Sequence, residues 1–189
     1  IGDETFKIDL PFLVMATQNP VEQEGAYELP EAQLDRFMMK VDVGYNTNEE
    51  ELEIARRATN NTFGDIHKVA SIDDLNKIRE EALQVHMDEE IEVYIIELVA
   101  ATRDPKAYGL EELEAYIEFG ASPRASIDMY KAARAIAYLK GQDYVSPIEI
   151  AYIAKEILRH RIILSYEAQA EEVTQDEIIE KILAAVPIP

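Results

Sequence analysis

The sequence contains no cysteine, which excludes disulfide bonds and thiolate metal sites and fits the reducing cytoplasm. No apolar run approaches the roughly eighteen residues that a transmembrane helix needs. The first ten residues, IGDETFKIDL, lack the basic and apolar regions of a signal peptide. Basic residues are few, because 18 Lys and Arg stand against 38 Asp and Glu, and the net charge of -20 repels phosphate backbones. We therefore expect a cytoplasmic protein that neither spans a membrane nor binds nucleic acid.

Several chemical motifs are missing as well. No glycine is followed by Lys-Ser or Lys-Thr, so the phosphate-cradling P-loop is absent. No apolar strand ends in a pair of carboxylates fit to hold magnesium, and Lys40-Val41-Asp42 is only a weak imitation of that pattern. Ser, His and Asp form no recognisable nucleophile motif, and His67 and His86 stand alone without ligand spacing. We expect no metal site in this chain.

The 189 residues, 48% hydrophobic and 30% charged, suit a globular protein with one substantial core or two small ones. Phe12 to Ala16 form an unbroken apolar run, which predicts a strand buried on both faces of a parallel sheet. Thr5 to Ile8 and Met38 to Val43 are further strand candidates, but the sequence holds no other partners for them. We therefore interpret the chain as a piece of a longer polypeptide, and we expect self-association through the Phe12 to Ala16 edge.

From Gly44 onward the pattern is helical, because cap residues precede apolar positions that recur at helical spacing. The expected helices, after a short one that Pro30 opens and Phe37 ends, are Thr47 to Arg57, Asp73 to Val85, Asp88 to Arg103, Leu110 to Phe119, Pro123 to Leu139, one that begins at Ser146-Pro147, and one that begins at Thr174 and ends before Pro187. The predicted fold class is mainly α: part of an α/β core over residues 1–43, then an all-helical region over residues 44–189.

Two stretches carry a family resemblance. ATQNP (16–20), EQEG (22–25) and LPEAQLDRF (29–37) resemble the second half of the nucleotide-binding core of the MoxR-type AAA+ ATPases, and GASPRA (120–125) resembles the start of their lid helix. The resemblance covers nearly the whole chain. It implies a C-terminal part of such an ATPase, with ATP and Mg²⁺ bound between core and lid in the intact protein. It also implies a homo-oligomeric ring, expected to be a hexamer, that remodels an unknown partner protein.

Asn19 is the first candidate site residue. An amide at the end of a buried strand can orient a water or touch a terminal phosphate, and in the resembling family the sensor-1 polar residue stands at this position. From the residue alone, a simple cap of the turn before Pro20 is the favoured explanation of Asn19, and the ATQNP match reverses this preference.

Arg36 is the second candidate. Its guanidinium fork suits phosphate oxygens, and the resemblance implies that it is the arginine finger supplied to a neighbouring subunit. Local pairing with Asp35 or a contact with the helix dipole is the alternative.

Arg124 is the third candidate, and its position conflicts with a local rule. With Ser122 as N-cap and Pro123 at the first helical position, Arg124 lies in a turn where the helix dipole disfavours a cation. A bound anion would remove the conflict. The resemblance implies that Arg124 is the sensor-2 arginine, which contacts the γ-phosphate. A solvated or carboxylate-paired arginine is the alternative.

Arg159-His160-Arg161 form a basic cluster at the end of a predicted helix, where the dipole favours cations, so a structural role suffices. A role at a subunit interface is the other interpretation.

Because the Walker A and Walker B motifs are absent, we expect the chain alone to bind no nucleotide tightly and to have no ATPase activity. The rival interpretation is a non-enzymatic helical adaptor whose acidic amphipathic helices bind a protein partner.

Overall fold

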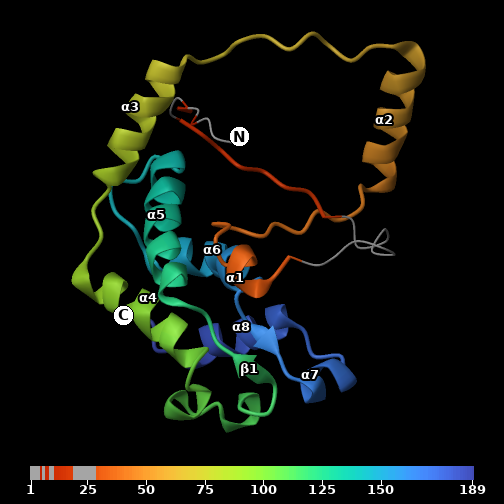
Figure 1. The fold of residues 1–189 in the computed structure, drawn as a ribbon. Helices are drawn as coiled ribbons and strands as arrows, with labels where there is room; N and C mark the ends of the chain where they lie inside the picture. Colours follow the sequence, from red (N-terminus) through yellow and green to blue (C-terminus); the bar gives the residue numbers. More distant parts are fainter. Residues whose placement is uncertain (1–4, 6, 9–10, 19–28) are drawn as a thin grey trace.

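The computed structural model describes residues 5, 7–8, 11–18 and 29–189, and within them the chain is mainly α-helical (Figure 1). The described elements are α1 (Glu31–Leu34), α2 (Asn48–Asn60), α3 (Ile72–Leu83), α4 (Glu89–Ala101), the 3₁₀ helices η2 (Pro105–Tyr108) and η3 (Glu111–Leu113), β1 (Ile117–Phe119), α5 (Pro123–Leu139), α6 (Pro147–Leu158), β2 (Ile163–Leu164), α7 (Tyr166–Ala170) and α8 (Gln175–Ala185). None of the helices among these residues is both long and apolar enough to cross a membrane.

Capping boxes begin four of these helices, and three of the four begin at residues where the sequence predicts a helix start. The N-cap residues Thr47, Ser71, Ser146 and Thr174 each form a box with the acidic residue three positions later. Each box satisfies backbone N–H groups that the first helical turn leaves without partners. The box at Ser71 uses Asp74 as its acidic partner.

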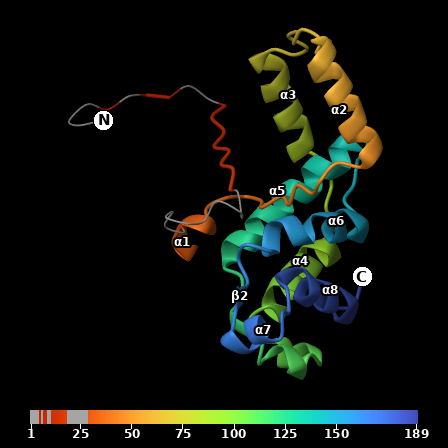
Figure 2. The same ribbon diagram turned by 90° about the vertical axis from the view of Figure 1, so that its right-hand side faces the viewer.

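Helices α4, α5, α6 and α8 enclose the core. In Figure 2 helix α6 lies between α5 and α8, and it contacts both. Ala132, Ala133 and Ala137 of α5 are buried, which allows the close approach of a neighbouring helix. Fully buried apolar side chains fill the space between the helices, among them Ile95, Leu98, Met129, Ile157 and Ile178.

The strands predicted in the first part of the chain are not formed. Phe12 to Ala16 make no strand and are exposed, as are Thr5, Lys7 and Ile8, the described residues of the opening candidate. Met38 to Val43 also lack strand structure. The physical reason is that a strand needs hydrogen-bonding neighbours, and the described chain offers none to these segments. The self-association predicted through Phe12 to Ala16 and the boundary between residues 43 and 44 both stay predictions.

The predicted helix from Leu110 to Phe119 is wrong. Only the 3₁₀ helix η3 forms there, and β1 follows it and pairs antiparallel with β2 through Ile117 and Leu164. β2 is not predictable from the sequence pattern, because a strand of two residues is too short to show a period. β1 leads directly into the loop before α5.

Candidate functional site

Arg36 lies in the turn that follows α1. The turn is held by hydrogen bonds from the N–H of Asp35 to the carbonyl of Glu31, at 2.9 Å, and from the N–H of Arg36 to the carbonyl of Gln33, at 3.2 Å. The Arg36 side chain is exposed, and no ion pair joins it to a carboxylate in the part of the chain that the structure describes. Asn19, the other predicted site residue from this part of the chain, lies outside the described residues.

The start of α5 is fixed by the C-terminal end of α4. The N–H of Ala121 donates to Oγ1 of Thr102 at 2.9 Å, and Nε of Arg103 donates to the carbonyl of Ala121 at 2.6 Å. A Cβ atom on Gly120 would lie 2.3 Å from the carbonyl oxygen of Thr102, so only glycine fits this close approach. The loop therefore delivers Ser122 to the N-terminus of α5 in a defined position.

Ser122 and Arg124 occupy the first turn of α5 as the sequence predicts. Ser122 is the N-cap, and its Oγ accepts a hydrogen bond from the N–H of Arg124 at 3.2 Å. The Arg124 side chain is half exposed, at 50%, so it is neither buried nor locked in place.

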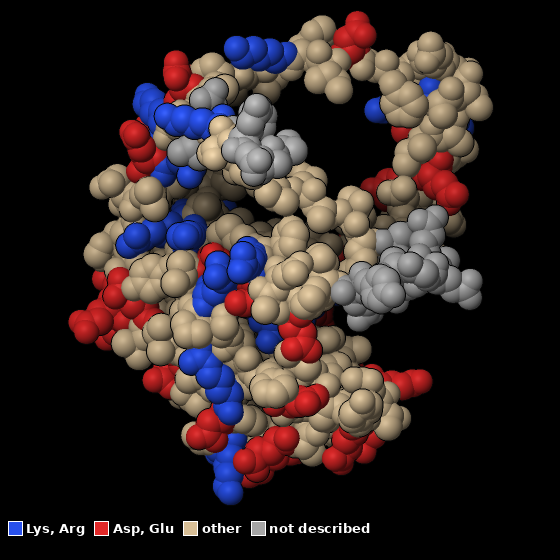
Figure 3. Space-filling model, in the orientation of Figure 1, with Lys and Arg blue, Asp and Glu red and all other residues tan. Residues whose placement is uncertain are grey.

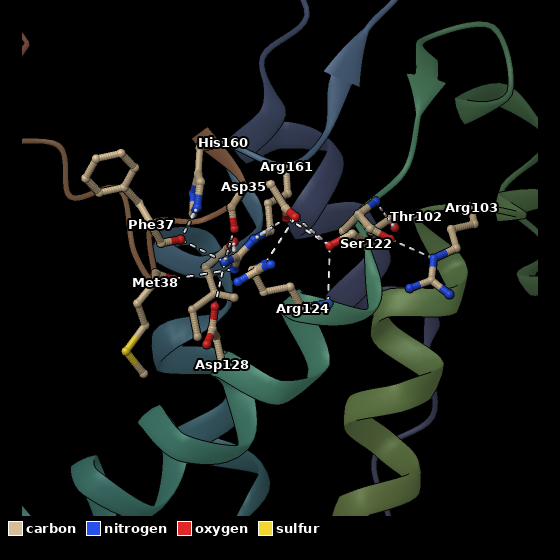
Figure 4. Close-up of polar contacts among 12 residues, drawn as sticks. Asp35, Phe37, Met38, Thr102, Arg103, Ser122, Arg124, Asp128, His160 and Arg161 are labelled. Carbon is tan, nitrogen blue, oxygen red and sulfur yellow. Dashed lines mark hydrogen bonds and ion pairs between the residues drawn. The ribbon is translucent and has the colours of Figure 1, made fainter. Parts of the chain in front are cut away.

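Asp35 supplies an anion at this helix N-terminus. The hydroxyl of Ser122 donates to both carboxylate oxygens of Asp35, at 2.9 and 3.0 Å, and Nε of Arg124 lies 3.5 Å from Oδ2 of Asp35 (Figure 4). The carboxylate thus lies at the positive end of the α5 dipole and beside Arg124, the cation that this dipole disfavours. In the structure, Arg124 is therefore paired with a carboxylate, which is the alternative interpretation given above. This carboxylate belongs to Asp35, the residue next to Arg36.

Arg161 holds the same turn through a second set of contacts. Its side chain is fully buried, and its Nε lies 3.0 Å from Oδ1 of Asp35, while Nη2 lies 2.6 Å from Oδ2 of Asp128. The same guanidinium donates to the backbone carbonyls of Asp35, Phe37 and Ile157 at 3.1, 2.8 and 2.9 Å. One buried guanidinium group therefore connects the Arg36 turn to α5 and α6.

The neighbours of Arg161 bind the same segment. Arg159 forms a bidentate pair with Asp176, with Nε to Oδ1 at 2.7 Å and Nη2 to Oδ2 at 2.8 Å, and it also donates to the carbonyl of Lys40. This pair lowers the pKa of Asp176 and raises that of Arg159. His160 donates from Nε2 to the carbonyl of Phe37 at 2.9 Å, and burial lowers its pKa.

From the sequence alone, the helix dipole explains the basic cluster Arg159-His160-Arg161. Its tertiary contacts are not predicted from the sequence. The missed signal is the spacing of Arg161, which follows the buried Ile157 by four residues and so continues the buried face of α6. A cation on a buried face requires a carboxylate partner from elsewhere in the chain.

The chemistry open to this arrangement is anion binding. Within the described residues no group of three or more His, Asp and Glu side chains is placed to hold a metal ion. Lys and Arg side chains are exposed around α3, α5 and α1 on the face in Figure 3, although the chain carries a net charge of -20. A half-exposed guanidinium beside a helix N-terminus can bind a phosphate oxygen.

Comparison with known proteins now adds independent support. The family described as the AAA lid domain matches residues 111–182, and the "ATPase family associated with various cellular activities (AAA)" matches residues 1–39. Chaperone MoxR1 of Mycobacterium tuberculosis is 42% identical over the whole of this chain. The chain belongs to the MoxR-type AAA+ family. It corresponds to the C-terminal part of such a protein, as its motifs predict.

Other relatives agree with a MoxR-type chain. The uncharacterized protein YeaC of Bacillus subtilis is 38% identical over the whole of this chain. The crystal structure of a candidate ATPase from Cytophaga hutchinsonii superposes with a TM-score of 0.94 at 52% identity, and covers 100% of this chain and 58% of that one. The chain spans about half the length of the curated relatives, 50% of MoxR1 and 57% of YeaC.

Proposed function

We propose that the intact protein is an ATPase that binds ATP and Mg²⁺ between its core and its helical lid. In this proposal Arg124 binds the terminal phosphate from within the subunit. Arg36 reaches the nucleotide of the next subunit in a ring, expected to be hexameric, and Asn19 orients the attacking water. Hydrolysis then drives the remodelling of a partner protein.

The observation that carries the proposal is the position of Arg124. Its guanidinium is half exposed at the N-terminus of α5, beside Ser122, and a carboxylate already lies against it. Such a site favours anions, because the helix dipole and the cation act in the same direction. The family match places this helix start in a lid domain, which supports phosphate as the anion.

Phosphoryl transfer to water needs chiefly positioning and charge stabilisation. The described chain contributes two arginines for this purpose and none of the groups that would hold Mg²⁺. The residues that bind the triphosphate and the metal are therefore proposed to belong to the remainder of the protein. We accordingly expect the 189-residue chain alone to have no ATPase activity.

The test measures ATP turnover by the full-length protein. Arg124→Ala and Arg36→Ala are each expected to reduce turnover by about a hundredfold or more, because each removes a cation from the transferring phosphate. Arg57→Ala is the matched control, since Arg57 pairs on the surface with Glu53 at 2.8 Å and should leave turnover unchanged. Wild-type turnover in both test variants would contradict the assigned roles.

The adaptor interpretation makes the opposite prediction. A helical adaptor binds its partner with or without nucleotide, so partner binding by the full-length protein would not respond to ATP. A GxxxxGK[ST] loop in the coding sequence of the full-length protein, followed by ATP-dependent partner binding, is the result that the ATPase proposal expects.

A further inference from the structure

Asp35 joins the two arginines of the proposed site. It precedes Arg36 in the chain, and its carboxylate reaches Arg124 at 3.5 Å, Ser122 at 2.9 and 3.0 Å, and Arg161 at 3.0 Å (Figure 4). The side chain of Asp35 is 26% exposed, so this carboxylate lies at the border between the buried contacts and the open surface.

The partners of Asp35 differ in how firmly they are held. Arg161 is fully buried and donates to four backbone carbonyls besides its carboxylate partners, so its position is fixed. Arg124 is half exposed, and the contact with Asp35 is its one ion pair within the described part of the chain. An exposed pair at 3.5 Å is weak, so Arg124 is the partner that can leave.

The departure of Arg124 would leave no buried charge without a partner. Asp35 would keep the hydroxyl of Ser122 and the guanidinium of Arg161, and both are closer to it than Arg124 is. Arg124 would exchange one carboxylate oxygen for a phosphate, which carries more charge and offers three acceptor oxygens. Asp35 and a phosphate are therefore competitors for the same cation.

We propose that Asp35 is a positioning residue that competes with the terminal phosphate of a nucleoside triphosphate for Arg124, and so lowers the affinity of the site for nucleotide. This inference rests on the proposed function, because it requires that Arg124 bind phosphate. Its consequence is that nucleotide binding loosens one of the contacts that hold the Arg36 turn against α5.

The experiment is a double-mutant cycle in the full-length protein, with the Kd of the non-hydrolysable β,γ-imido analogue of ATP measured by calorimetry in the presence of Mg²⁺. Arg124→Gln is expected to weaken binding at least about tenfold. Asp35→Asn is expected to strengthen binding about twofold to fivefold, the size of one exposed ion pair. In the Arg124→Gln background, Asp35→Asn is expected to have no effect.

A matched control separates competition from loss of the Arg161 contacts. Asp128 also pairs with Arg161, at 2.6 Å, and has no ion pair with Arg124, so Asp128→Asn should leave the Kd unchanged. If Asp35→Asn unfolds the protein, Asp35→Ser removes the same charge and keeps an oxygen for Arg161. Circular dichroism verifies that each variant is folded before its Kd is compared.

Three results would overturn the inference, and they differ from failure of the proposed function. The inference fails alone if Arg124→Gln weakens binding but Asp35→Asn does not strengthen it. It also fails alone if Asp35→Asn strengthens binding equally with and without Arg124, since direct repulsion of phosphate then explains the gain, or if Asp128→Asn gives the same gain. Unchanged binding in Arg124→Gln contradicts the proposed function itself.

Discussion

The carboxylate of Asp35 and the guanidinium of Arg161 lie 3.0 Å apart, although 126 positions separate the two residues in the chain. Arg161 follows α6 and is fully buried, whereas Asp35 belongs to the turn that presents Arg36. The short segment around Arg36 is therefore fixed to the helical body by a partly buried ion pair. This contact determines where Arg36 lies relative to Arg124.

Arg161→Met is expected to destabilise the protein by about 3–5 kcal/mol, because it leaves the carboxylate of Asp128 buried without its cation. Urea denaturation followed by far-ultraviolet circular dichroism measures the change in the free energy of unfolding. Arg57→Met, at an exposed pair with Glu53, is the control and should stay within about 1 kcal/mol of wild type. Equal losses in the two variants would contradict the role of Arg161 as the anchor of this turn.

His160 should make stability depend on pH below about 6.5, its ordinary pKa. Burial lowers the pKa of His160 in the folded protein, so the unfolded chain binds more protons below 6.5 and stability falls as the pH decreases toward the folded pKa. His160→Gln should flatten this slope in urea denaturations performed between pH 7 and pH 5. The control replaces the exposed His67 with Gln, which leaves His160 and its neighbours in place, and it should keep the wild-type slope.

Gly120→Ala should destabilise the protein by about 1–3 kcal/mol, because the added methyl group would lie 2.3 Å from the backbone oxygen of Thr102. Gly44→Ala is the matched control, since no atom lies within 4 Å of the position of its added Cβ. Thermal unfolding of both variants measures the difference. A melting temperature for Gly120→Ala equal to that of the control would mean that α4 and the loop before α5 do not approach as closely as described.

The helices could be predicted from sequence because their signals are local. Helices begin after Thr47 and Ser146 as predicted, where each cap residue forms a capping box, and α5 runs from Pro123 to Leu139 as predicted. Each of these signals depends on residues within one turn of the helix end.

The errors arise where structure depends on distant residues. Phe12 to Ala16 have the composition of a buried strand, but strand formation needs partners that the described chain does not provide. The site showed the same limit: the position of Arg124 in a first helical turn predicted that an anion would remove its conflict with the dipole, but it could not reveal that Asp35, far away in sequence, provides one. Only the fold brings these two residues together.

The most direct test of the account mixes two inactive variants of the full-length protein, Arg36→Ala and Arg124→Ala, in equal amounts and measures ATP turnover after the rings have exchanged subunits. If Arg124 acts within its own subunit and Arg36 acts on the next one, about a quarter of the sites in mixed rings contain both arginines, because a heterologous ring pairs subunits at random. The account predicts recovery of about a quarter of wild-type turnover by this arithmetic. Turnover that stays at the level of the separate variants, in rings shown to have exchanged, would contradict it.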